Sequence, residues 1–356
     1  MSGAGAGNQI AFAGGANDWI FAIYDIVDIY NTTTSQWSTS NLTAARYKLA
    51  AAATAGQIIF AGGVDDGLGV VYDNADIYNA TTSTWFSSTL SARLTCGAGT
   101  DSIALFAGGV DLTGNVKNTV DLFHANSYTW TTATLSQARM NSAACAAGGK
   151  IFIAGGIDSL GQVSNRVDIY DLVTGIWSID SLSEARAFLT AAGVGTLAIF
   201  AGGGDANTTV SSKRVDMFNT TSGIWQTDSL ATARTFAAAT SAGNKFIIGG
   251  GTTLPFSISA DIEMYSVGSA GLEEATTKDD FILSPNPANA EVVITSRKTD
   301  IESVRLLNTT GALIWSLNGV KMNRVDLPVH LMSEGLYIVE IISTAGQRSG
   351  YKLIKH

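Results

Sequence analysis

The sequence predicts an all-β protein in which one unit repeats six times before a smaller β domain. Two observations carry this prediction. Six short apolar strands end in a Gly-Gly pair every 46–48 residues, at Gly14-Gly15, Gly62-Gly63, Gly108-Gly109, Gly155-Gly156, Gly202-Gly203 and Gly249-Gly250. A single Trp follows five of these pairs at a similar period, at Trp37, Trp85, Trp130, Trp177 and Trp225. Such a period indicates a supersecondary unit that buries its apolar face by stacking on copies of itself.

One unit, from Arg46 to Trp85, contains four short strand segments. Small apolar residues fill 49–54, a second apolar segment covers 58–61, a third covers 75–78, and Trp85 opens the fourth. Gly, Asn and Ser separate these segments, which favours antiparallel strands joined by turns. Four such strands in one repeat are typical of a propeller blade, with Ala and Gly at the crowded axis and aromatic side chains in the wedge between blades.

This pattern resembles the Kelch repeat, in which Gly-Gly ends the second strand, Tyr lies in the third and Trp follows. The resemblance covers residues 1 to about 270 and implies a six-bladed Kelch-type β-propeller over residues 1–267. Phe123 and Phe218 replace the Tyr, and Leu272 stands where a sixth Trp is expected. The first unit has no preceding Arg, and the resemblance implies that the chain ends meet within one blade. We therefore expect the native N-terminus to lie upstream of Met1.

The period stops after Tyr265. Residues 268–280 are a polar linker, and residues 281–356 contain seven strand-like segments that predict a small Ig-like β-sandwich. Ser284-Pro285-Asn286-Pro287, the segments 304–308 and 327–341 and the closing 351–356 resemble the type A sorting domain of the type IX secretion system. The resemblance implies export from a Gram-negative bacterium, with residues 281–356 as the partner of the secretion machinery. A generic accessory sandwich is the alternative.

Export of this kind needs a signal peptide, and the first residues have neither a basic nor an apolar region of that type. This is a second reason to expect further sequence upstream. The resemblance places the mature protein outside the cell or on the outer-membrane surface.

Composition limits the possible partners. The formal charge is −9, and only 14% of residues are charged. This argues against nucleic acid and anionic membrane surfaces as partners. No apolar run approaches a membrane span of about 20 residues. We expect a monomer, with Cys96 and Cys145 as small buried hydrophobes.

Little in the sequence indicates catalysis. Only His124, His330 and His356 are present, too few in the repeats for the copper site of Kelch-type oxidases. No Ser/His/Asp set and no zinc spacing occurs, so no cofactor and no metal are expected. Whether the protein is an enzyme stays uncertain. A propeller-type carbohydrate-active enzyme with an unlocated active site, and a structural surface protein, are the alternatives to a recognition module.

Recurring polar residues are the candidates for binding. An arginine precedes each inner strand, at Arg46, Arg93, Arg139, Arg186 and Arg234. The resemblance places this position at one mouth of the central channel, where Tyr47, Phe188 and Phe236 would stack on a sugar or a peptide. The alternative is that each Arg pairs with an acid or a carbonyl of its own blade, because strict recurrence favours a structural role.

The Gly pairs are followed by Asp65, Asp111, Asp158 and Asp205. These carboxylates would form a calcium-binding ring or would cap their own turns. The sequence therefore predicts a secreted or cell-surface module that recognises a glycan or a protein through its propeller.

Overall fold

The computed structural model describes residues 1–17, 22–65, 69–92, 96–111, 113–253, 257–266, 281–286, 288, 291–296, 299–308, 313–344 and 348–355. The chain divides into two compact units, Met1–Val267 and Gly268–His356. The expected linker 268–280 and Leu272 lie outside the described residues. Within the described ranges no helix has the length and apolar character needed to cross a membrane.

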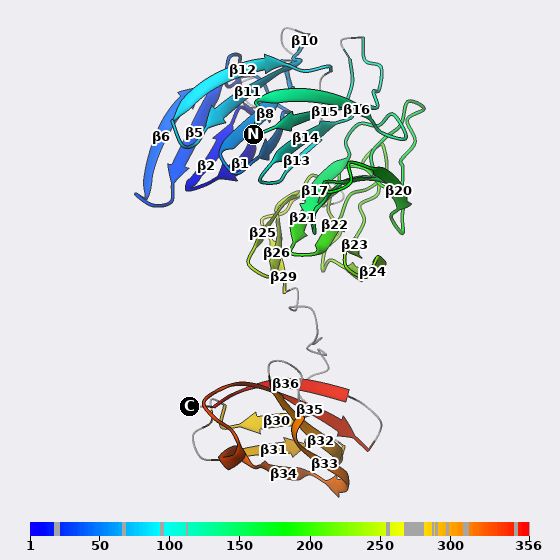
Figure 1. Cartoon of the computed structure of the whole chain (residues 1–356). Coiled ribbons are helices and arrows are strands. Elements are labelled where there is room, and N and C mark those ends of the chain that lie inside the picture. Colours follow the sequence, from blue (N-terminus) through cyan, green and yellow to red (C-terminus); the bar gives the residue numbers. More distant parts are fainter. Residues whose placement is uncertain are drawn as a thin grey trace. The chain divides into compact units, whose positions relative to one another are not determined.

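The first unit contains six antiparallel sheets of three or four described strands, which follow one another along the chain (Figure 1). The first two sheets are β1 (Ser2–Ala6), β2 (Gln9–Ala13), β5 (Ile26–Asn31) and β6 (Gln36–Asn41), then β7 (Ala50–Ala53), β8 (Gln57–Ala61), β11 (Asn74–Asn79) and β12 (Thr84–Thr89). The third and fourth are β13 (Cys96–Gly99), β14 (Ile103–Ala107), β15 (Thr119–His124) and β16 (Thr129–Thr134), then β17 (Ala143–Ala147), β18 (Lys150–Ala154), β19 (Arg166–Asp171) and β20 (Trp177–Ser181). The fifth is β21 (Thr190–Val194), β22 (Leu197–Ala201), β23 (Arg214–Asn219) and β24 (Ile224–Ser229), and the sixth has the described strands β25 (Ala238–Ala242), β26 (Lys245–Gly249) and β29 (Ile262–Ser266). The six-bladed architecture predicted from the repeats is confirmed.

Three of the connections between second and third strands contain a small sheet of two strands, each two residues long. They are β3 (Ala16–Asn17) with β4 (Ala22–Ile23), β9 (Val64–Asp65) with β10 (Val70–Val71), and β27 (Thr252–Thr253) with β28 (Ser257–Ile258). In every sheet this connection lies at the same end of the strands, because each sheet is an antiparallel meander.

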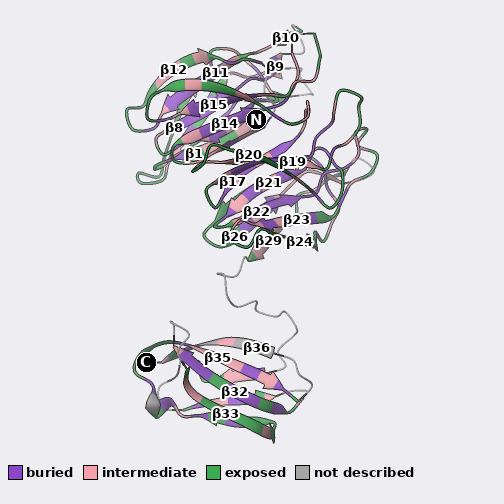
Figure 2. Ribbon diagram, turned by 45° about the vertical axis from the view of Figure 1, so that its right-hand side comes forward, coloured by how far each residue is buried: buried purple, intermediate pink, exposed green. Residues whose placement is uncertain are grey.

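The core of the first unit lies between consecutive sheets. Five clusters of buried apolar side chains each join one sheet to the next along the chain. Figure 2 shows buried residues along the inner strands and exposed residues in the connections and along the fourth strands. The fourth-strand Trp faces the Tyr or Phe of the third strand, with ring centroids 5.0–5.2 Å apart. These aromatic pairs fill the outer part of the layer between two sheets, which is wider than the part near the propeller axis.

The sixth Gly pair lies one residue later than the sequence pattern suggested. Gly249 ends β26 as an ordinary strand residue, whereas Gly250 and Gly251 have φ of 68° and 89°. These values match those of Gly202 and Gly203, 65° and 92°. The prediction of Gly249-Gly250 was wrong, because three consecutive glycines left the register open and the backbone uses the last two.

The two end sheets each present one apolar face to solvent. Phe12 and Trp37 of the first sheet are 38% and 61% exposed, whereas Phe60, at the position equivalent to Phe12, is fully buried. On the sixth sheet, Ile262 and Met264 are 70% and 55% exposed. The faces in the five layers between sheets are therefore covered by neighbouring sheets, and these two outer faces are not.

Both cysteines are buried and free. Cys96 lies in the layer between the third and fourth sheets and Cys145 in the layer between the fourth and fifth. Burial raises the pKa of each thiol to about 12. Each behaves as the small apolar residue that its place in an inner strand requires.

The second unit is a sandwich of two antiparallel sheets. One has the order β30 (Phe281–Ser284), β31 (Val292–Ser296), β34 (Arg324–Leu327). The other has the order β33 (Leu313–Met322), β32 (Ile301–Asn308), β35 (Gly335–Ser343), β36 (Arg348–Lys355), and a short 3-10 helix, η1, covers Val329–Leu331. The seven predicted strands are present, and an immunoglobulin-like relationship stays a prediction.

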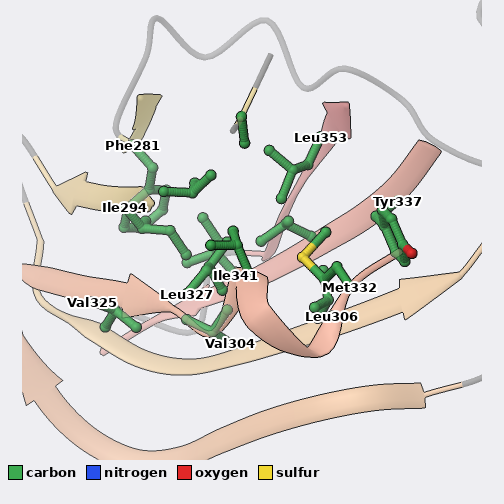
Figure 3. Close-up of a cluster of buried hydrophobic side chains, with 14 of the residues drawn as sticks. Phe281, Ile294, Val304, Leu306, Val325, Leu327, Met332, Tyr337, Ile341 and Leu353 are labelled. Carbon is green, nitrogen blue, oxygen red and sulfur yellow. The ribbon is translucent and has the colours of Figure 1, made fainter. Parts of the chain in front are cut away.

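Alternating side chains from both sheets fill the core of the second unit. Phe281, Ile294 and Leu327 of one sheet pack with Leu306 and Ile341 of the other (Figure 3). Along β34 and β35, buried positions alternate with more exposed ones, the pattern of strands with one face in a core. This unit therefore has an independent apolar core, as a separately folding domain needs.

The Trp position provides a matched stability test. Trp130 is half-buried against Phe106 and Phe123, whereas Trp37 holds the same repeat position on an uncovered face. We expect Trp130→Ala to lower the free energy of unfolding by about 3 kcal/mol, because it removes a packed aromatic side chain. Trp37→Ala should change it by less than about 1 kcal/mol. Urea unfolding of both variants checks this, and equal losses would contradict the assignment of the end face as uncovered.

Candidate recognition face

The predicted arginines lie inside the sheets. Arg46, Arg139 and Arg186 have no exposed surface, and Arg234 has 1%. Their guanidinium groups pair with Asp76, Asp168, Asp216 and Glu263 at 2.7, 2.7, 2.5 and 2.6 Å. Three also donate to a second-strand carbonyl, that of Phe60, Ile153 or Phe200, at 3.3–3.4 Å. Each arginine thus ties the segment before an inner strand to the second and third strands of its own sheet.

Burial and pairing shift the pKa of these arginines in opposite directions. Desolvation lowers the pKa of Arg46, Arg139 and Arg186, and the adjacent aspartate counteracts it. The aspartates have further partners: the Ser136 N–H donates to Asp168 and the Ser183 N–H donates to Asp216. Several charge-assisted hydrogen bonds therefore compensate for placing a charge in the interior.

The same arginine segment explains the Gly pairs. The second glycine of one sheet donates its N–H to the Arg carbonyl of the next sheet, for example Gly156 to Arg186 at 3.0 Å. A Cβ on the first glycine would lie 2.3–2.6 Å from that carbonyl at Gly14, Gly108, Gly155 and Gly202. Both glycines have positive φ. A side chain would therefore clash and strain the backbone where consecutive sheets meet.

The structure gives these arginines a structural role, in place of the ligand-binding role that was expected for them. The guanidinium groups of Arg46, Arg139, Arg186 and Arg234 are covered and paired, so a ligand does not reach them without opening the sheet. Arg93 lies outside the described residues. The alternative of an Arg–acid pair within each blade describes the four that the structure covers.

Two residues after each of these arginines, the backbone turns left-handed. Lys48, Asn141, Phe188 and Phe236 have φ of 54–55°. Positive φ is uncommon for residues other than glycine and costs about 1–3 kcal/mol in a bulky residue. The ladder between neighbours fixes this conformation, because Phe188 N–H donates to the Asn141 carbonyl and Phe236 N–H donates to the Phe188 carbonyl, both at 3.1 Å.

This backbone brings two of the predicted aromatic residues together. The rings of Phe188 and Phe236 lie 4.5 Å apart at 40°. Phe188 is half-buried, and Phe236 is 57% exposed. Tyr47 lies on another sheet, half-buried, with the Lys48 ammonium 5.0 Å from its ring centroid. The predicted set therefore divides into one aromatic pair and one separate tyrosine.

Apolar side chains are also exposed on the neighbouring connections. Val70, Leu160, Val210 and Ile258 belong to connections between second and third strands and are 36%, 80%, 60% and 87% exposed. These connections lie at the same end of the strands as the left-handed residues. In a meander, the connection from the second to the third strand and the connection from the fourth strand to the next sheet lie at one end. We call this side, with Phe188 and Phe236, the recognition face.

The aspartates of these connections cap turns. Asp111 accepts N–H groups from Thr113 and Asn115, and Asp158 accepts them from Leu160 and Gln162, all at 2.9 Å. The Lys117 ammonium and these hydrogen bonds hold the pKa of Asp111 well below its usual range. Among the described residues no group of three or more His, Cys, Asp or Glu is placed to hold a metal ion. The turn interpretation of these aspartates rests on the N–H groups that Asp111 and Asp158 accept.

Sequence reasoning missed Lys48 and Asn141 as members of the left-handed set. The available signal was the constant offset of two residues after each Arg, where Lys, Asn and two Phe occur. Their chemical variety hid a shared backbone conformation. The same variety is what a ligand-binding position in an otherwise symmetric ring would show.

The buried pair makes a stability prediction. We expect Arg139→Met to lower the free energy of unfolding by about 3–5 kcal/mol, because Asp168 is left buried without its counter-charge. Lys117→Met breaks the partly exposed surface pair with Asp111 and should cost much less than Arg139→Met. Denaturant unfolding followed by circular dichroism measures both. A loss at Arg139 no larger than that at Lys117 would show that the buried pair does not support the sheet.

Comparisons with known proteins agree with this geometry. The Kelch motif matches residues 138–179, and the secretion system C-terminal sorting domain matches residues 283–356. The structure of YjhT superposes with a TM-score of 0.61 at 15% identity, over 76% of this chain and 95% of YjhT. No curated protein matches the chain. The chain therefore contains a Kelch motif within a β-propeller fold and a C-terminal secretion system sorting domain, and this sorting domain indicates secretion.

Proposed function

We propose that the propeller is a non-catalytic recognition module that binds a glycan on its recognition face. The contact between the half-buried Phe188 and the exposed Phe236 carries the proposal. Two aromatic rings held 4.5 Å apart on left-handed backbone are kept despite local strain, and such strain concentrates at functional sites.

The chemistry around the pair suits a carbohydrate. Aromatic faces stack on the C–H faces of sugar rings, and a small number of polar groups sets orientation. Asn141 shares the backbone ladder with Phe188, and the capped turns of Asp158 and Asp205 border the same side. A protein ligand would use the same aromatic pair with the exposed Leu160 and Val210, so it is the alternative outcome of the experiment below.

Glycine substitution separates binding from stability. Phe236→Gly removes the exposed ring and relieves the positive φ, so we expect the free energy of unfolding to stay unchanged or to rise by up to about 1 kcal/mol. Binding of the full chain to a glycan array should be lost. Ile224→Ala removes a side chain that is 58% exposed at the opposite end of the strands of the fifth sheet. This change should leave binding intact.

Three results would count against this proposal. They are array binding that survives Phe236→Gly, an array without any hit, and hits that are all proteins in a parallel protein panel. A bound glycan that is chemically converted would instead support a carbohydrate-active enzyme.

We also propose that the second unit directs passage across the outer membrane of a Gram-negative bacterium and that the first unit is its cargo. The sorting-domain match covers residues 283–356 of the second unit, Gly268–His356. Its separate core of buried residues supports independent folding. The mature protein would then be released or held at the cell surface.

Secretion can be tested by deletion and by fusion. With a signal peptide added, and in a host that has the type IX system, the chain without residues 281–356 should remain in the periplasm as a folded propeller. Residues 281–356 fused to an unrelated reporter should carry it into the medium. Immunoblots of periplasm and medium measure both. Export of the truncated chain at the full-length level would refute the sorting role.

A further inference from the structure

The sequence contains a single Asn-Gly pair, Asn318-Gly319, which lies in β33 of the second unit. Asparagine loses ammonia when the backbone nitrogen of the following residue attacks its side-chain carbonyl carbon. A glycine in the following position leaves that nitrogen unhindered, because no Cβ lies beside it. A β-branched residue there is stiff and crowds the approach. This pair is therefore the place in the sequence where the reaction meets the least steric resistance.

The pair lies where β33 departs from its partner strand. Asn318 pairs with Ser303 of β32, and the next pair along the ladder is Met322 with Ile301. Between these two pairs β33 has the residues 319–321, whereas β32 has a single residue. Extra residues of this kind form a bulge, in which the ladder is interrupted. The backbone that follows Asn318 is therefore not held in register by β32.

Space is available around the attacking nitrogen. Asn318 and Gly319 are both exposed. Gly319 has a φ of 69°, and a Cβ built on it would have no atom within 4 Å apart from those of its chain neighbours. β33 is also an edge strand, so no described strand pairs with its outer side. The five-membered ring that the reaction forms therefore has room at this position.

The side chain of Asn318 is not held in place. Its carboxamide has no hydrogen-bond partner among the described residues. Asparagines of the repeat region differ, because Asn31, Asn79 and Asn219 each accept two backbone N–H groups on Oδ1. Such bonds fix the carboxamide in its turn, and the residue that follows each of these three carries a Cβ. The reaction is thus disfavoured at these asparagines and favoured at Asn318.

We propose that Asn318 is a site of spontaneous deamidation in the folded protein. The Gly319 nitrogen gives its proton to water and forms a C–N bond to the carboxamide carbon, while the bond from that carbon to the amide nitrogen breaks and ammonia leaves. The product is a cyclic succinimide. Water then opens the ring at one of its two carbonyl groups, which yields aspartate or isoaspartate at position 318. The only co-reactant is water.

The reaction changes the second unit in two ways. A carboxylate replaces a neutral carboxamide on an exposed edge strand, and isoaspartate also lengthens the main chain by one carbon. Because the residues 319–321 do not pair with β32, we expect the added length to be accommodated there and the rest of the sheet to stay intact. This inference does not depend on the proposed glycan binding or on the proposed secretion role.

Peptide mapping of the aged full-length protein tests the proposal. The native chain is incubated at mildly alkaline pH, digested with trypsin and analysed by mass spectrometry. The tryptic peptide 306–321 contains Asn318 and also Asn308, which precedes Thr309 and serves as the internal control. We expect the mass gain of an amide-to-acid change to accumulate at Asn318 and not at Asn308. A protein isoaspartate methyltransferase should then methylate the same peptide.

Two variants separate the reaction from the fold. Asn318→Gln keeps an amide but needs a less readily formed six-membered ring, so the mass gain should be lost. Gly319→Ala places a Cβ beside the attacking nitrogen and should also suppress the gain. Because alanine is strained at a φ of 69°, circular dichroism of both variants checks that the second unit remains folded.

Three results would overturn the proposal. The first is native protein without a gain at Asn318 after a period in which urea-unfolded protein is converted, because β33 would then hold the pair in an unreactive geometry. The second is a gain that persists in Asn318→Gln. The third is an equal gain at Asn308, which would show that the Asn-Gly pair has no special reactivity.

Discussion

The buried pair of a linker arginine and a third-strand acid is the interaction on which the repeat region depends. The arginine side chain fixes the second and third strands of its own sheet, while its carbonyl accepts the Gly N–H of the preceding sheet. One residue therefore sets both the inside of a blade and the angle to its neighbour. The glycines follow from it, because the carbonyl lies where a Cβ would be. A weakly charged sequence can place these charges in its interior because each has two or more partners.

Much of the fold could be predicted from the sequence, because a repeat reports each feature several times. The Gly pairs and the Trp period predicted the six sheets, and the alternating strands of residues 281–356 predicted the sandwich. The sixth Gly pair was misplaced because the glycine run at 249–251 fits two registers and only the backbone φ selects one. The burial of Arg139 and its equivalents could be offered only as one of two alternatives, because an arginine next to a turn looks the same whether it faces solvent or an aspartate.

The recognition face illustrates the opposite case. Its left-handed residues occupy the same position in four units, yet they are Lys48, Asn141, Phe188 and Phe236. The backbone conformation therefore repeats, whereas the side chains differ. Neighbour-to-neighbour packing makes this division possible, because the residues that join the sheets repeat while the left-handed residues vary. The contact between Phe188 and Phe236 arises across two sheets, and the sequence could name both residues without showing that they meet.

The placement of the two thiols has a consequence for oxidative folding. An exported chain passes through a compartment where disulfides form readily. Cys96 and Cys145 lie in different inter-sheet layers and are both buried, and their raised pKa keeps them protonated rather than nucleophilic. Once the blades have packed, neither thiol can attack an oxidant or cross-link with another chain. Both thiols of the folded repeat region are therefore shielded from oxidation, and neither is joined in a disulfide.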